Sequence, residues 1–403
     1  MKLNFFTFFS NIYKLFCYKF TRFEPQIIEK LDLLSSSTAS ETQPLKPSNS
    51  SACRSKTSSS SNEISINIGD SEIRQKVHGF GGALTDAVCK NLSDLPENLA
   101  KELINCYAGE DSAGYQIVRT PISGSDFSER TYTYLDKPND FELKTFSLEP
   151  EDDDKLLWLK YMAKRAAECG DYLGFMCSSW SAPVWMKNNN SFKGRGRLRG
   201  NPGDEYHKTW ARYLIKFLDV YREKGVEFDY MTIQNEPTNG YAIPAFWNSL
   251  GFSASHMRDF VSNDLAPEVE KSKHFEMTKL MMLDDIRLWL PNRPKTIFAD
   301  QKANSVISGI GVHWYMNYLI GTKALDKTHA AFPDKFMLGT EACHEAKPSP
   351  PDSTDTDVQW NRGEKYRAFS KKLNNFIFRK NNFFLFSKIN PTFVAIYNQK
   401  RPV

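Results

Sequence analysis

The fold follows from one stretch of the chain, Phe228–Pro237, which reads FDYMTIQNEP. Its first seven residues form an apolar, strand-length run, and Asn235, Glu236 and Pro237 follow directly. A second stretch, Phe336–Cys343 (FMLGTEAC), repeats the arrangement, with Glu341 just after a short apolar run. Two buried strands that both end in a carboxylate predict a parallel sheet with functional groups along one edge.

Similar runs recur from about Glu63 onward, separated by longer amphipathic segments. Seven strands are predicted: Val77–Ala83, Gln116–Pro121, Leu173–Ser178, Phe228–Gln234, Lys279–Leu283, Ile307–Trp314 and Phe336–Gly339. Between them, aromatic residues and Leu at three- and four-residue steps predict a helix over Tyr206–Tyr221, and acidic residues 152–154 open another over Leu156–Ala167. The alternation predicts an α/β fold, a (β/α)₈ TIM barrel with one strand missing.

Three regions are expected from the composition along the chain. Residues 1–62 combine a poor signal-like segment with a Ser-rich linker that is expected to be disordered. Residues 63–370 are predicted to form the barrel, and residues 371–403 a divergent tail without clear periodicity. Seven strands would leave two unpaired edges, which proteins normally avoid.

The overall composition excludes several classes of protein. The net charge of +4 is too small to predict a nucleic-acid partner, and Arg195, Arg197 and Arg199 are expected in a solvated loop. The mean hydropathy is −0.51 and no 18-residue apolar run occurs, so no transmembrane helix is expected. The seven cysteines include no CxxC pair, so they predict no zinc site.

The two glutamates suggest hydrolysis of a glycosidic bond. Retention of configuration requires two carboxyl groups about 5–5.5 Å apart, one to protonate the leaving oxygen and one to attack the anomeric carbon. Taken alone, Asn235-Glu236-Pro237 is more typical of an ordinary strand-to-helix turn. Glu341, at another strand end three strands later, favours the catalytic interpretation.

Several motifs then resemble the acid glucosylceramidases of glycoside hydrolase family 30. They lie in order over about residues 77–366 and are His78–Ala87 (HGFGGALTDA), Arg119–Pro121 leading to Ser125–Ser128, Arg130–Tyr134 (RTYTY), Ser179–Pro183 (SWSAP), Pro202–Asp204, Met282–Asp285 (MLDD) and Val312–Tyr315 (VHWY). The family has a Trp-rich eighth strand and a β-sandwich that this sequence mostly lacks. The chain is therefore expected to be a truncated or mis-spliced form.

The resemblance implies a role for each glutamate. Glu236 would be the general acid/base, with a raised pKa, and Glu341 the nucleophile that forms a glucosyl-enzyme. Arg119 would keep Glu341 ionised, although an ordinary ion pair at the barrel rim is the alternative.

Five further positions would contribute to the sugar pocket. Asp126 and Trp180 would hold the glucose hydroxyls and ring face, with a turn residue and a core aromatic as the alternatives. Asn235 would hydrogen-bond the 2-hydroxyl. His313 and Tyr315 would lie near the pocket floor, although His313 could equally be a satisfied core histidine.

The resemblance also implies what the protein would act on. The substrate would be glucosylceramide in membranes, cleaved to glucose and ceramide in sphingolipid metabolism, in the lysosome. A saposin-type activator and anionic lipid would assist, and no metal or organic cofactor would be needed. The alternatives are a catalytically inactive fragment and a retaining glycosidase for another β-linked sugar.

Overall fold

The computed structural model describes residues 75–109, 112–242, 245–272, 274, 276–317, 319–343 and 394–399. The signal-like segment and Ser-rich linker predicted over 1–62 lie outside these residues. The described strands form one closed barrel in chain order: β1 (Gln75–Ala83), β2 (Ile117–Ile122), β3 (Gly174–Ser179), β4 (Tyr230–Thr232), β5 (Lys279–Ile286), β6 (Ile307–His313), β7 (Phe336–Glu341) and β8 (Val394–Gln399). Neighbours from β1 to β7 pair in parallel, so the predicted α/β barrel is confirmed.

Strand β8 corrects one prediction. Residues 371–403 were expected to add no strand, but Val394–Gln399 pairs antiparallel with β1 on one side and with β7 on the other. The barrel therefore has no unpaired edge between β7 and β1 in the described residues. The run Phe393–Tyr397 (FVAIY) is short and continuously apolar, and periodicity alone cannot assign such a run to a strand.

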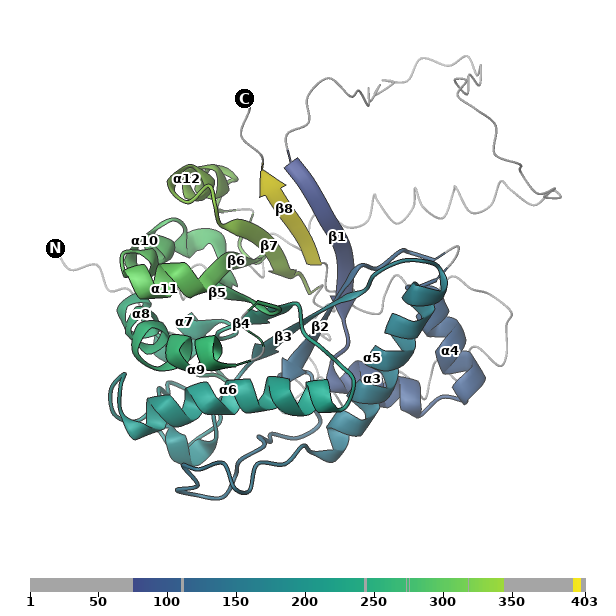
Figure 1. The fold of residues 1–403 in the computed structure, drawn as a ribbon, viewed down its shortest axis with the longest axis horizontal. Helices are drawn as coiled ribbons and strands as arrows, with labels where there is room; N and C mark the ends of the chain where they lie inside the picture. Colours follow the sequence, from purple (N-terminus) through teal and green to yellow (C-terminus); the bar gives the residue numbers. More distant parts are fainter. Residues whose placement is uncertain are drawn as a thin grey trace, which may run out of the picture. The chain divides into compact units, whose positions relative to one another are not determined.

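Helices lie around the strands and follow them along the chain (Figure 1). The two predicted helices are present and begin earlier than expected: α5 starts at Pro150 and α6 at Glu205. The helices are α3 (Asp86–Ser93), α4 (Glu97–Asn105), α5 (Pro150–Glu168), α6 (Glu205–Glu223), α7 (Pro237–Tyr241), α8 (Ala254–Phe260), α9 (Ala266–Lys271), α10 (Asn292–Phe298), α11 (Gln301–Val306) and α12 (Lys323–Ala331). Among the described residues, none of these helices is both long and apolar enough to cross a membrane.

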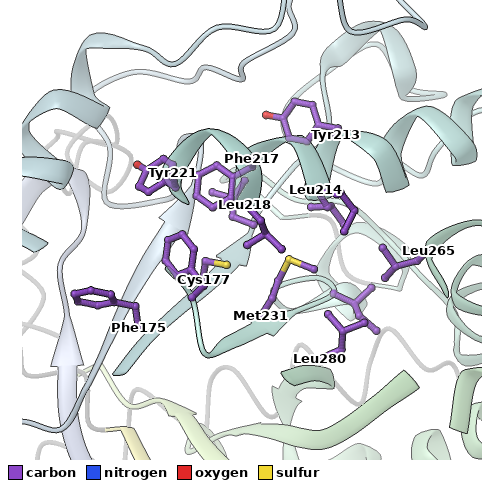
Figure 2. Packing of buried hydrophobic residues seen from close by; sticks show 14 of the residues in the cluster. Phe175, Cys177, Tyr213, Leu214, Phe217, Leu218, Tyr221, Met231, Leu265 and Leu280 are labelled. Atoms are coloured by element: carbon purple, nitrogen blue, oxygen red, sulfur yellow. The ribbon is translucent and has the colours of Figure 1, made fainter. Parts of the chain in front are cut away.

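The apolar face of α6 packs on the outer surface of the sheet. Figure 2 shows Leu214, Phe217 and Leu218 of α6 beside Cys177 of β3 and Met231 of β4. These side chains are buried, so the three- and four-residue spacing in the sequence marks the contact between helix and sheet.

The barrel interior is a separate and smaller core. Ile117, Met176, Met281 and Leu338, from four different strands, form one buried apolar layer inside it. Side chains alternate between the faces of a strand, so residues two positions later face inward again. In β2, β3 and β7 those positions are polar and buried, and they form a second layer towards the carboxyl ends of the strands: Arg119, Ser178 and Thr340.

Candidate active site

The two predicted carboxylates meet at the carboxyl end of the barrel. Glu341 is the last residue of β7, and Glu236 is the residue that caps the N-terminus of α7 after β4. Glu236 has a left-handed backbone (φ 41°, ψ 59°), which costs a non-glycine residue about 1–3 kcal/mol and is typical of functional sites. One oxygen of each carboxylate and one ring nitrogen of His313 lie within 4.8 Å of one another.

Arg119 connects Glu341 to the rest of the site. Its guanidinium donates to Glu341 Oε2 (2.5 Å), to Asn235 Oδ1 (2.8 Å) and to Asp284 Oδ2 (2.9 Å). It also lies over the ring of Trp180, 4.9 Å from the centroid. The Arg119 side chain is 3% exposed, so its charge acts on Glu341 with little screening by water.

His313, the last residue of β6, lies beside both glutamates, and Tyr315, two residues later, bonds to Glu341. His313 Nδ1 lies 2.9 Å from Glu236 Oε1, and its Nε2 lies 3.1 Å from Asp284 Oδ1. Tyr315 donates its hydroxyl to Glu341 Oε1 (2.8 Å), and the backbone N–H of Cys343 donates to that hydroxyl oxygen. His313 is fully buried with a partner at each ring nitrogen, as a satisfied core histidine would be, and those partners are Glu236 and Asp284. Its role in the sugar pocket stays a prediction.

The environment shifts the pKa values of the two glutamates in opposite directions. Burial is the main cause that raises the pKa of Glu236 to about 7, although His313 opposes it. Burial also acts to raise the pKa of Glu341, but the charges of His313 and Arg119 outweigh it and lower that pKa. A protonated Glu236 can therefore stand beside an ionised Glu341 at mildly acidic pH.

The group Glu236, His313 and Glu341 has residue types that could bind a metal. Burial lowers the pKa of His313, but the charges of Glu341 and Asp284 outweigh it and raise the pKa well above its ordinary value. A protonated imidazole has no lone pair for a metal, and Arg119 already provides a positive charge at Glu341. These residues therefore do not fit a metal site.

The remaining predicted residues lie at the ends of other strands. Trp180 directly follows β3 and is 5% exposed, and the backbone N–H of Asn235 donates to Ser179 O (2.8 Å). Asp126 is half-buried in the segment after β2. That segment is held by Ser125, whose N–H donates to Ser128 Oγ (2.8 Å). The role of Asp126 in binding sugar stays a prediction.

Comparison with known proteins agrees with this geometry. Over 271 residues the chain is 43% identical to the lysosomal acid glucosylceramidase of Mus musculus, covering 67% of this chain and 52% of that protein. Over 310 residues it is 36% identical to putative glucosylceramidase 4 of Caenorhabditis elegans, covering 77% and 59%. Residues 77–402 match the glycosyl hydrolase family 30 TIM-barrel domain. The chain belongs to this family.

A solved structure supports the same assignment. The endo-beta1,6-glucanase BT3312 superposes with a TM-score of 0.61 at 26% identity, covering 69% of this chain and 60% of that one. The chain spans little more than half the length of the curated family 30 relatives described above. The family match ends at residue 402, beyond the domain end predicted at residue 370.

Asp284 is a residue of this candidate site that the sequence did not predict, and Asn239, which donates its side-chain amide to Glu236 Oε2, is another. Met281 faces the barrel interior, so regular alternation would turn Asp284 outward. A β-bulge after Leu283, with positive φ at Leu283 (72°) and Asp284 (47°), instead turns the Asp284 carboxylate inward. The motif Met282–Asp285 contributes to the resemblance to the family, but its residue types do not indicate a bulge.

Proposed function

We propose that the chain is a retaining β-glucosidase that hydrolyses glucosylceramide to glucose and ceramide. The observation that carries the proposal is the pair of partly buried carboxylates, Glu236 and Glu341, which have one oxygen each within 4.8 Å of the other and pKa values shifted in opposite directions. Retaining glycosidases need a separation of about 5–5.5 Å, whereas inverting ones leave about 6.5–9.5 Å for a water molecule.

The reaction proceeds by double displacement. Glu236 gives its proton to the glycosidic oxygen while Glu341 attacks the anomeric carbon, so the bond to ceramide breaks and a glucosyl-enzyme forms. Glu236, now ionised, then takes a proton from water, and that water attacks the anomeric carbon and releases Glu341. Glucose leaves with its original configuration.

The neighbours of the pair assist each step. Arg119 and Tyr315 bond to Glu341 and keep it ionised until it attacks. Asn235 is fixed by Arg119 through its Oδ1, which leaves its amide nitrogen to donate to the sugar 2-hydroxyl. Trp180 and Asp126 hold the ring face and the hydroxyls of the glucose.

The choice of substrate rests on the relatives. The mouse relative is named a lysosomal acid glucosylceramidase and the nematode relative a putative glucosylceramidase. By analogy, the substrate lies in a membrane, the compartment is the lysosome, and a saposin-type activator with anionic lipid assists. A second candidate is hydrolysis of a β-1,6-linked glucan, because the chain is also 27% identical to an endo-1,6-beta-D-glucanase of Neurospora crassa.

Two measurements test the proposal. A fluorogenic β-glucoside should be hydrolysed at acidic pH, and Glu341→Gln should abolish hydrolysis, whereas Glu223→Gln, on the exposed side of α6, should not. A 2-deoxy-2-fluoro β-glucoside should lose its aglycone and add the mass of one 2-deoxy-2-fluoroglucosyl group to the peptide that contains Glu341. Equal activity of the wild type and Glu341→Gln would show that Glu341 is not the nucleophile, and no hydrolysis by the wild type would favour an inactive fragment.

A further inference from the structure

We propose that Asp284 is a positioning residue that keeps both ring nitrogens of His313 protonated, so that the transferable proton of Glu236 resides on Oε2. The inference rests on the proposed function, because it concerns the acid/base of that reaction. It assigns a specific oxygen atom to the proton transfer and gives a role to the bulge in β5.

Asp284 contacts both Arg119, which bonds to Glu341, and His313, which bonds to Glu236. Its Oδ2 accepts from Arg119, which holds Glu341, and its Oδ1 lies 3.1 Å from His313 Nε2, whose other nitrogen contacts Glu236. Ser178 and Thr232 donate their hydroxyls to Oδ2, each at 2.7 Å. The buried carboxylate of Asp284 thus connects Arg119, the partner of the nucleophile Glu341, to His313, the partner of the acid/base Glu236.

These contacts keep Asp284 ionised. Its side chain is fully buried, which would favour the neutral acid, but Arg119 and His313 outweigh burial and lower its pKa. A carboxylate can only accept hydrogen bonds, so His313 must carry a proton on Nε2. The tautomer with a bare Nε2 is therefore excluded.

The second ring proton follows from the charges that face His313. Asp284 of β5 and Glu341 of β7 are the ionised groups nearest to it, with Glu341 Oε1 3.8 Å from Nδ1. Glu236 after β4 provides the acceptor for Nδ1, and Arg119 of β2 is the opposing cation. Two negative carboxylates outweigh one positive guanidinium, so the charges around His313 stabilise its doubly protonated imidazolium form.

An imidazolium determines which oxygen of Glu236 carries the proton. Nδ1–H donates to Oε1, so that oxygen serves as the acceptor in the protonated acid as well as in the carboxylate. Asn239 donates its side-chain amide to Oε2, but this amide is neutral, whereas the imidazolium is a charged donor and bonds more strongly to an oxygen that carries no proton. The acidic proton therefore resides on Oε2, which can still accept from Asn239 as a hydroxyl oxygen. Without Asp284, a neutral His313 could accept the Glu236 proton at Nδ1 and withdraw it from the leaving group.

The direct test is nuclear magnetic resonance of the full chain labelled with ¹⁵N-histidine. The His313 signals are identified by their loss in His313→Gln. In the wild type both ring nitrogens of His313 should be protonated from pH 5 to pH 7.5. A singly protonated His313 at pH 6 in the wild type would overturn the proposal, whatever the variants do.

Asp284→Asn removes the charge at almost constant volume and supplies the second test. His313 should then become singly protonated at neutral pH. In Asp285→Asn, the matched control one residue later, His313 should stay doubly protonated, because Asp285 bonds to Thr238 and Ile286 instead. An unchanged His313 signal in folded Asp284→Asn would contradict the proposal.

Activity gives a further readout that a purely structural role would not produce. Asp284→Asn should lower kcat by about 100-fold or more, the scale of general acid catalysis, and move both limbs of the pH profile of kcat/KM to higher pH. If Asp284→Asn lowered kcat/KM by the same factor at every pH, with both limbs of the pH profile unmoved, the proposal would be contradicted. If the wild type hydrolyses no glycoside, the proposed function fails, but the His313 spectrum still tests Asp284.

Discussion

Glu236 and Glu341 are chemically identical side chains that differ in which charges surround them. Arg119 and Tyr315 bond to Glu341, whereas Glu236 bonds to His313 and Asn239 and, among the described residues, to no guanidinium. Burial therefore dominates at Glu236 and ion pairing at Glu341. Because the pKa values of the two glutamates are shifted apart, one site can hold a protonated acid and an ionised carboxylate together.

A pH profile follows from these shifts. Hydrolysis needs Glu341 ionised and Glu236 protonated, so it should rise with pH through the lowered pKa of Glu341 and fall through the Glu236 pKa of about 7. We expect a bell-shaped kcat/KM for a fluorogenic β-glucoside, with its alkaline limb near pH 7. An alkaline limb that persists in Glu236→Gln would assign it to another group.

Gly311 makes room for Asp284. A Cβ at this position would lie 3.1 Å from Asp284 Oδ1 and 3.1 Å from the Thr340 side chain. Gly311→Ala should therefore displace the Asp284 carboxylate and cost about 1–3 kcal/mol of stability, the usual range for overpacking. The melting temperature and kcat should both decrease. Gly321→Ala, where no atom lies within 4 Å of the new Cβ, is the control and should change neither.

At the scale of elements, α3 and α5 are joined by a buried ion cluster. Lys155 Nζ of α5 lies 2.9 Å from Asp152 Oδ1 and 3.3 Å from Asp86 Oδ1 of α3, and the three side chains are at most 4% exposed. Asp86 also accepts from Ser128, in the segment that carries Asp126. The cluster therefore links two helices to one wall of the candidate site.

Removal of the cation should destabilise the protein strongly. Lys155→Met leaves two buried carboxylates without their partner, and breaking a buried pair costs about 3–5 kcal/mol. Chemical denaturation should show this loss, whereas Lys160→Met, on the exposed side of the same helix, should lie close to the wild type. A loss of less than about 1 kcal/mol would mean that the ion pairs of Lys155 contribute little to the stability of the fold.

At the scale of the whole molecule, closure of the barrel depends on β8. Ala395 is paired with Phe80 of β1 and with Gly339 of β7, two residues before Glu341. A strand with neighbours on both sides tolerates no proline, because proline has no backbone N–H to donate.

Ala395→Pro should therefore open the barrel beside Glu341. We expect a lower melting temperature and loss of hydrolysis, measured by thermal unfolding and with the β-glucoside. Ala395→Val retains the N–H and should behave like the wild type. If Ala395→Pro has the melting temperature and the hydrolysis rate of the wild type, β8 does not close the barrel in solution.

The sequence alone determined most of the elements and the positions of the two candidate catalytic glutamates. The seven parallel strands, the apolar face of α6, and Glu236 and Glu341 at strand ends all follow from local patterns of apolar and polar residues. Such patterns are visible because a strand or helix buries its own neighbours at a fixed period. The resemblance of the motifs pointed to family 30, which the match over residues 77–402 confirms.

Only the tertiary structure decided β8 and Asp284. β8 pairs with β1, more than three hundred residues earlier, so no local signal reports the contact. The bulge in β5 reverses the alternation from which inward and outward positions are predicted, and it places Asp284 between Arg119 and His313. Both features arise from backbone pairing between distant segments, whereas periodicity in a sequence reports only the burial of residues close together in the chain.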